Sequence, residues 1–299
     1  MRLDDLDDGN ISDDVRVEDQ RGGGGGGFGF PGLGGGGGLG VGRSMGCGTL
    51  AIVIIAALVF GVNPMQILGG GEPTAPTQVQ RPAAEGGQAV NCEADAASRF
   101  SCLVLLSNNQ TWAKQFTDGG YRAPKIVFYS GRGQSGCGSA QSAMGPFYCP
   151  ADQGIYLDTD FYRELSQRFG AGGDFAQAYV ISHEVGHHLQ HLTGLADKVR
   201  NAQARASQIE GNKLQVAMEL QADCYAGVWA ALNKDRMEPG DVEEGLRAAH
   251  QIGDDVLQRA TQGVVVEAAF THGSAAQRME WLRRGLQTGD PDQCNTFGR

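Results

Sequence analysis

The sequence predicts an α+β fold, in which a small β-sheet is followed by a mostly helical half. The segments KIVFY at 125–129 and GPFYCPADQGIYLD at 145–158 are short and rich in β-branched and aromatic residues, which is typical of strands. The second segment predicts two strands around a turn at PADQG. From Asp174 onward, apolar residues recur at helical spacing. Strands followed by a run of helices favour α+β over an alternating arrangement.

Composition divides the 299-residue chain into four parts. Residues 1–48 are acidic and then rich in glycine, and we expect a disordered tail because neither stretch can bury a core. Residues 49–68 are uncharged and largely apolar, and we interpret them as one transmembrane anchor, since about 20 residues cross a bilayer. A buried core helix and a cleaved signal peptide are the alternatives. Residues 69–90 form a Pro/Gly linker and residues 91–299 form the folded domain.

The charge of the chain restricts its partners and its orientation. A formal net charge of -10 argues against a nucleic-acid partner, because phosphates would be repelled. Arg43 precedes the apolar stretch and Glu72 follows it, which weakly favours a cytoplasmic N-terminus. We therefore expect a single-pass protein of the cell membrane, with its folded domain outside the cytoplasm.

Cysteine usage agrees with an exported domain. Six of the seven cysteines follow the apolar stretch, and in an oxidising compartment they would pair. Cys92–Cys102 and Cys137–Cys149 would close short loops, which leaves Cys224 and Cys294 for each other. The alternative is six free thiols in a cytosolic protein.

The stretch AYVISHEVGHHLQHLTG, at 178–194, holds four of the six histidines. It contains HExxH, formed by His183, Glu184 and His187, on a predicted helix. Residues four apart lie on one helix face, so both imidazoles can reach one ion. Glu184 flanks that position and can hold a water molecule.

A third ligand is needed, because HExxH alone is modest support for a metal site. The helix MELQADCYAGVWAAL carries Glu219 and Asp223 four residues apart in an apolar setting. Catalytic zinc commonly takes two histidines and one glutamate, and a metal-bound histidine usually donates its second N–H to a carboxylate. We therefore expect His183, His187 and Glu219 to bind one Zn²⁺, with Asp223 orienting a histidine. Two acids on a solvated helix face are the alternative.

The segments HEVGHH, ELQADCYAGVW and FTHGSAAQR resemble the YpfJ-like family of neutral zinc metallopeptidases, and the resemblance covers nearly the whole chain. The stretch SGCGSAQSAMGPFYCPADQGIYLD resembles the family's signature before the metal helix. HExxH followed by ExxAD is similar to the gluzincin pattern. The resemblance implies a zincin-like fold, one zinc ion and hydrolysis of a peptide or protein substrate.

Two further histidines lie in informative places. His272 precedes a capping box formed by Ser274 and Gln277, so its loop is held by a helix start. We expect His272 to stabilise the oxyanion, as the similarity to the gluzincin Thr-His loop also implies; a structural loop histidine is the alternative. His191 continues the row of His187, and we place it beside the site rather than among the ligands.

The sequence thus predicts a membrane-anchored zinc endopeptidase with Glu184 as general base. A zinc-binding scaffold or an inactive homologue is a second interpretation, which a fourth protein ligand such as His191 or Cys224 would favour. An assembly function of the acidic, Gly-rich tail is a third. The sequence does not specify the substrate or the oligomeric state.

Overall fold

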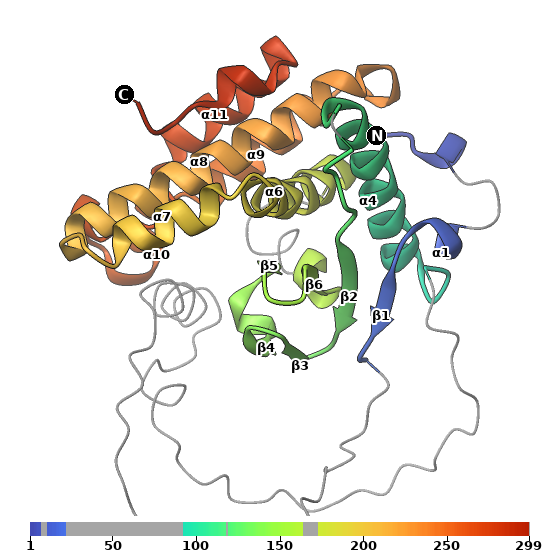
Figure 1. Cartoon of the computed structure of the whole chain (residues 1–299), viewed down its shortest axis with the longest axis horizontal. Helices are drawn as coiled ribbons and strands as arrows, with labels where there is room; N and C mark the ends of the chain where they lie inside the picture. Colours follow the sequence, from blue (N-terminus) through green and yellow to red (C-terminus); the bar gives the residue numbers. More distant parts are fainter. Residues whose placement is uncertain (7–10, 22–91, 118, 164–172, 299) are drawn as a thin grey trace, which may run out of the picture.

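The computed structural model describes residues 1–6, 11–21, 92–117, 119–163 and 173–298 (Figure 1). It confirms the α+β prediction, because short strands precede a helical half. The strands are β1 (Val17–Asp19), β2 (Lys125–Tyr129), β3 (Arg132–Ser135), β4 (Gly138–Gln141), β5 (Phe147–Cys149) and β6 (Gly154–Asp158). The helices are α1 (Ile11–Asp14), α4 (Ala96–Gln115), α6 (Asp174–Leu192), α7 (Leu195–Gln203), α8 (Gln208–Leu232), α9 (Asp241–Gln251), α10 (Asp254–Gln262) and α11 (Ala275–Thr288). Short 3₁₀ turns are η1 (Asp4–Leu6), η2 (Ser142–Met144), η3 (Lys234–Arg236), η4 (Glu267–Ala269) and η5 (Pro291–Cys294).

The main sheet has the strand order β1-β2-β6-β5. The first three strands are parallel, and β5 runs antiparallel to β6 at one edge. Side chains alternate between the two faces, as strand geometry requires. Ile126 and Phe128 belong to the main core, whereas Val127 and Tyr129 belong to a smaller cluster on the opposite face. Strands β3 and β4 form a separate hairpin.

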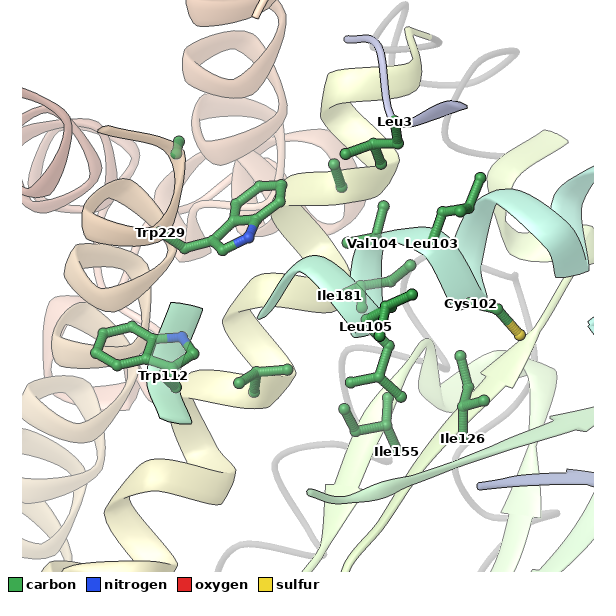
Figure 2. Close-up of a cluster of buried hydrophobic side chains, with 14 of the residues drawn as sticks. Leu3, Cys102, Leu103, Val104, Leu105, Trp112, Ile126, Ile155, Ile181 and Trp229 are labelled. Carbon is green, nitrogen blue, oxygen red and sulfur yellow. The ribbon is translucent and has the colours of Figure 1, made fainter. Parts of the chain in front are cut away.

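The main core lies between the sheet and helices α4 and α6. Figure 2 shows Ile126 and Ile155 of the sheet close to Leu105 of α4 and Ile181 of α6, all of them fully buried. Complete burial of each such side chain contributes about 1.5–3 kcal/mol before the entropy cost of ordering it. This core fixes α6, the helix with the HExxH motif, above the sheet.

Helix α8 packs unusually close to two neighbouring helices. A Cβ atom at Gly186 of α6 would lie 2.8 Å from the Cα of Ala222 in α8. Cβ atoms at Gly227 of α8 and Gly285 of α11 would collide with the backbone of the facing helix. The absence of side chains at these positions therefore lets both helices bring their polar groups against α8.

The first residues of the chain pack into the folded domain, which corrects the expectation of a disordered tail for residues 1–6 and 11–21. Strand β1 extends the main sheet by pairing with β2. Buried apolar side chains of this segment join the main core, namely Met1, Leu3, Ile11 and Val15. The acidic composition of the segment did not indicate this docking, because a few spaced apolar residues are enough to dock a short segment on an existing core. Residues 22–48 lie outside the described residues.

The pairing of β1 with β2 also bears on the expected topology. Two hydrogen-bonded strands must lie on the same side of a membrane. A chain that crossed the membrane once between residues 21 and 92 would separate β1 from β2 and could not form this sheet. The pairing therefore argues against a cytoplasmic N-terminus combined with an external domain. The expected anchor at 49–68 lies outside the described residues. Within the described ranges, no helix combines the length and apolar character needed to cross a bilayer.

The three expected cysteine pairs are confirmed. Cys92 is bonded to Cys102, Cys137 to Cys149 and Cys224 to Cys294, with Cα–Cα distances of 5.8, 5.8 and 5.6 Å. The last bond ties α8 to η5, close to the C-terminus. Cys47 lies outside the described residues.

Candidate metal centre

The metal site expected from the sequence is assembled by two facing helices. His183 and His187 project from successive turns of α6, and Glu219 approaches them from α8. The Oε2 atom of Glu219 lies 3.1 Å from Nε2 of His183 and 3.5 Å from Nε2 of His187. All three side chains are largely buried, so the cluster lies inside the protein rather than on a solvated helix face.

The spacing of these atoms fits zinc. Bonds of about 2.0–2.1 Å in a tetrahedron place neighbouring ligand atoms roughly 3.3 Å apart. Within the described part of the chain, His183, His187 and Glu219 form a group whose possible ligand atoms all lie within 4.8 Å of one another. Neither His191 nor His272 belongs to it, and Cys224 is committed to a disulfide. Two histidines and one glutamate, with a position left for water, are typical of catalytic zinc.

A second acidic group, formed by Asp174, Asp241 and Glu244, also has closely spaced oxygens. The ammonium group of Met1 lies 2.7 Å from Asp174 and 3.3 Å from Asp241. These carboxylates therefore already have a cationic partner, and we assign no metal to them.

Asp223 holds His183 in place. Its Oδ1 atom lies 2.8 Å from Nδ1 of His183, so the imidazole presents Nε2 to the metal position. The same carboxylate accepts a hydrogen bond from the Tyr179 hydroxyl at 2.6 Å and two from the Arg278 guanidinium at 2.9 Å. Asp223 is fully buried and Arg278 is 3% exposed. Three partners from two helices thus fix one carboxylate behind the metal site.

Glutamine side chains hold the other two ligands. His187 directs Nδ1 to the Gln190 carbonyl oxygen at 2.9 Å. The Gln190 amide in turn donates to the backbone oxygen of Met218 in α8. Gln215 donates to Oε1 of Glu219 at 2.9 Å, which leaves Oε2 for the metal position. Each expected ligand therefore has one atom directed at the cluster and another held by the protein.

The charges of the cluster are strongly coupled. Burial opposes ionisation of Glu219, but the nearby His187 and His272 charges outweigh it and hold its pKa well below the usual range. Burial likewise favours neutral His183, yet Asp223 raises the pKa of that imidazole to about 10. For Asp223, Arg278 and His183 overcome burial and lower the pKa to about 2. The pocket therefore favours a buried cation between anionic carboxylates, and zinc binding would release protons from the imidazoles.

Glu184 lies beside the cluster but does not belong to it. Burial raises the pKa of its carboxyl group, while the charges of His187 and His183 act in the opposite direction. The backbone N–H of Tyr148 in β5 also acts to lower the pKa of this carboxyl group. A carboxyl group whose pKa is raised by burial suits the task of accepting a proton and returning it.

His272 lies on the loop before α11, and Asp254 organises that loop. Oδ2 of Asp254 accepts the backbone N–H groups of Thr271 and His272 at 2.7 Å and that of Gly273 at 3.1 Å. The Nδ1 atom of His272 faces the Thr271 hydroxyl at 3.0 Å. The predicted capping box of Ser274 and Gln277 is present. The loop lies against α8, because a Cβ atom at Gly273 would be 3.1 Å from a side-chain carbon of Leu220, the residue after Glu219. His272 is not one of the clustered ligands.

Several supporting residues were not predicted from the sequence. Asp254 is distant in sequence from every motif. Gln190 and Tyr179 share α6 with the histidines, but no motif marks them as hydrogen-bond partners. Only the spacing of Gln190, one turn after His187, could have signalled its role.

The fold and the site define a class: an α+β protein in which two packed helices bring together a buried His₂Glu group that could hold a metal ion. The chain belongs to the family described as "Putative neutral zinc metallopeptidase", whose match spans residues 7–297. It is 47% identical over 254 residues to "Uncharacterized protein YpfJ" of Escherichia coli (strain K12), covering 84% of this chain and 86% of the relative. It is 40% identical over 259 residues to "Uncharacterized protein Rv2575" of Mycobacterium tuberculosis (strain ATCC 25618 / H37Rv), covering 81% and 85%. No solved structure matches the chain significantly.

Proposed function

We propose that this protein is a zinc-dependent endopeptidase with a zincin-like catalytic domain. The observation that carries the proposal is the cluster of His183, His187 and Glu219, with Glu184 buried beside it. Within the described residues this set provides three protein ligands, as an open catalytic site requires. Membership of a zinc metallopeptidase family supports the same conclusion.

The chemistry follows from the positions of the side chains. His183, His187 and Glu219 would hold a zinc ion, which would lower the pKa of a water molecule and polarise the scissile carbonyl. Glu184 accepts the proton of the attacking water and returns it to the leaving amine. Asp223 keeps His183 in the tautomer and orientation that bind the metal. Arg278 neutralises Asp223, so that the buried carboxylate remains ionised.

Two further elements complete the proposed site. His272 donates to the oxyanion that forms on the substrate carbonyl, because its Nδ1 is held by the loop and its other nitrogen is left for the substrate. Strand β5 pairs with β6 along one edge only within the described residues, so its other edge can pair with an extended peptide. The substrate is therefore a peptide or protein segment in extended form.

The decisive test compares the full-length wild type with Glu184→Gln. The variant should keep one zinc per chain and lose nearly all hydrolysis of a quenched-fluorescent peptide library, because the amide cannot accept the proton. Zinc content by atomic emission and cleavage rates are measured on the same samples. Wild-type cleavage rates in the variant would refute Glu184 as general base.

A zinc-binding scaffold remains the second candidate. Cys224 and His191, the residues that could have closed the site, lie outside the ligand cluster, and this favours the enzyme. Wild-type protein that binds zinc tightly but cleaves no member of the library would favour the scaffold instead.

We also propose that the domain works in an oxidising compartment, which its three disulfides support. Residues 49–68 are apolar enough to attach the protein to a membrane, and the pairing of β1 with β2 requires β1 and the folded domain to lie on the same side of it. Non-reducing mass mapping of protein from native membranes tests the first point, and six free thiols would contradict it.

A further inference from the structure

His188 follows a proposed zinc ligand in sequence but faces the sheet instead of the metal position. Its side chain is completely buried. Nε2 lies 2.6 Å from the backbone oxygen of Arg122, and Nδ1 lies 2.9 Å from the hydroxyl of Tyr148. A carbonyl oxygen can only accept, so Nε2 carries the hydrogen and Nδ1 accepts the hydrogen of Tyr148. Both ring nitrogens of this imidazole are therefore used to hold other segments.

The two segments belong to the main sheet or lead into it. Tyr148 is the central residue of β5, and its backbone pairs with Ile155 of β6. Arg122 precedes β2, the strand next to β6 in the sheet. The ring of Tyr148 also packs against His188 with 5.3 Å between ring centres. The His188 imidazole on α6 thus holds both the edge strand β5 and the segment that leads into β2.

Tyr148 connects strand β5 to the face of α6 that carries the proposed general base. Its hydroxyl donates to Nδ1 of His188. Glu184 and His188 are four residues apart, so they share one face of the helix. The edge strand is therefore held one helical turn from Glu184 through a single tyrosine.

We propose that His188 is a positioning residue for the peptidase reaction: through Tyr148 it fixes strand β5 relative to the Glu184 carboxylate. The proposal rests on the proposed function. A peptide paired with the free edge of β5 presents its scissile bond to Glu184 only if strand and helix keep a fixed separation. A misplacement of about 1 Å can cost on the order of 10²-fold in rate. His188 acts without touching substrate or zinc.

The test uses full-length zinc-loaded protein and four variants. His188→Leu removes both hydrogen bonds and Tyr148→Phe removes one of them without changing the backbone. We expect kcat to fall by about 10–10² in each, with zinc content unchanged and KM little affected. The double variant should be no slower than the slower single variant, because both changes break the same link. His188→Gln, whose amide offers a donor and an acceptor, should recover most of the rate.

Hydrogen exchange of the Tyr148 amide gives a readout that does not depend on activity. It should be faster in His188→Leu and Tyr148→Phe than in the wild type, because the strand is released from α6. His250→Leu, a change at an exposed histidine on α9, should alter neither exchange nor kcat. Additive losses in the double variant, or zinc loss in Tyr148→Phe, would overturn the proposal.

Failure of the proposal is distinguishable from failure of the function. A wild type that cleaves no peptide defeats the peptidase assignment. A wild type that cleaves, alongside His188→Leu and Tyr148→Phe variants with the same kcat and the same Tyr148 exchange, defeats only the role of His188.

Discussion

The Nδ1 atom of His183 lies 2.8 Å from the buried carboxylate of Asp223, which in turn receives the guanidinium of Arg278. This contact links three helices: His183 is on α6, Asp223 on α8 and Arg278 on α11. Because α11 begins directly after the His272 loop, the same chain of contacts joins the metal ligands to the proposed oxyanion donor.

Asp223→Asn should weaken zinc affinity by about 10–100-fold, since the amide is a poorer partner for Nδ1 of His183 and for the Arg278 charge. Competition with a chromogenic chelator measures the affinity. Asp197→Asn, on the exposed surface of α7, is the matched control. Equal affinities in the two variants would show that Asp223 does not orient the ligand.

Glu219→Ala should abolish stoichiometric zinc binding, because two neutral imidazoles alone make an incomplete site. Gln215→Ala, which removes only the hydrogen bond to Oε1 of Glu219, should retain the metal with reduced affinity. Zinc content after gel filtration distinguishes them. Full retention of zinc by Glu219→Ala would place the third ligand elsewhere.

His272→Phe should reduce kcat by about 10²–10³-fold and leave zinc content and KM nearly unchanged, as expected when one oxyanion donor is lost. His250→Phe, an exposed position on α9, is the control and should be neutral. Steady-state kinetics with one fluorogenic peptide suffices. Loss of zinc in His272→Phe would make it a ligand, and an unchanged kcat would leave it a structural residue of the loop.

Asp254→Asn should change the pH dependence of stability. Burial would raise the pKa of Asp254, but its contacts with His272 and the loop N–H groups hold it below the usual value. The native state therefore binds fewer protons than the unfolded state, so this group stabilises the fold above about pH 4 and less as the pH falls further. Urea unfolding at pH 7 and near pH 3 should show a difference between wild type and variant that shrinks at low pH. A difference independent of pH would contradict this.

Ile11→Ala tests whether the first residues belong to the domain. Ile11 is 1% exposed and lies in the main core, so its truncation should lower the free energy of unfolding by about 2–5 kcal/mol. Ile209→Ala, at a position 50% exposed on α8, should cost far less. Chemical denaturation of the full-length variants provides both values. Equal effects would mean that the segment is undocked in solution.

Local sequence patterns predicted several elements of the fold. The strand at 125–129 was predicted with its observed limits, because four consecutive β-branched or aromatic residues after Lys125 leave few alternatives. The capping box at Ser274 and Gln277 was also readable, since it depends only on residues three apart. The docking of β1 could not be predicted from the sequence. It depends on the edge of β2, which can accept another strand only after distant segments have folded into the sheet.

The sequence by itself determined the composition of the candidate site, because HExxH and ExxAD place His183 and His187 on one helix face and Glu219 and Asp223 on another. Their meeting at 3.1–3.5 Å was decided by tertiary packing, in which Gly186 lets α6 approach α8. The supports Asp254 and His188 likewise became visible only in the folded chain. Each holds backbone groups that are remote in sequence, and a buried polar group finds such partners only when the whole domain has closed around it.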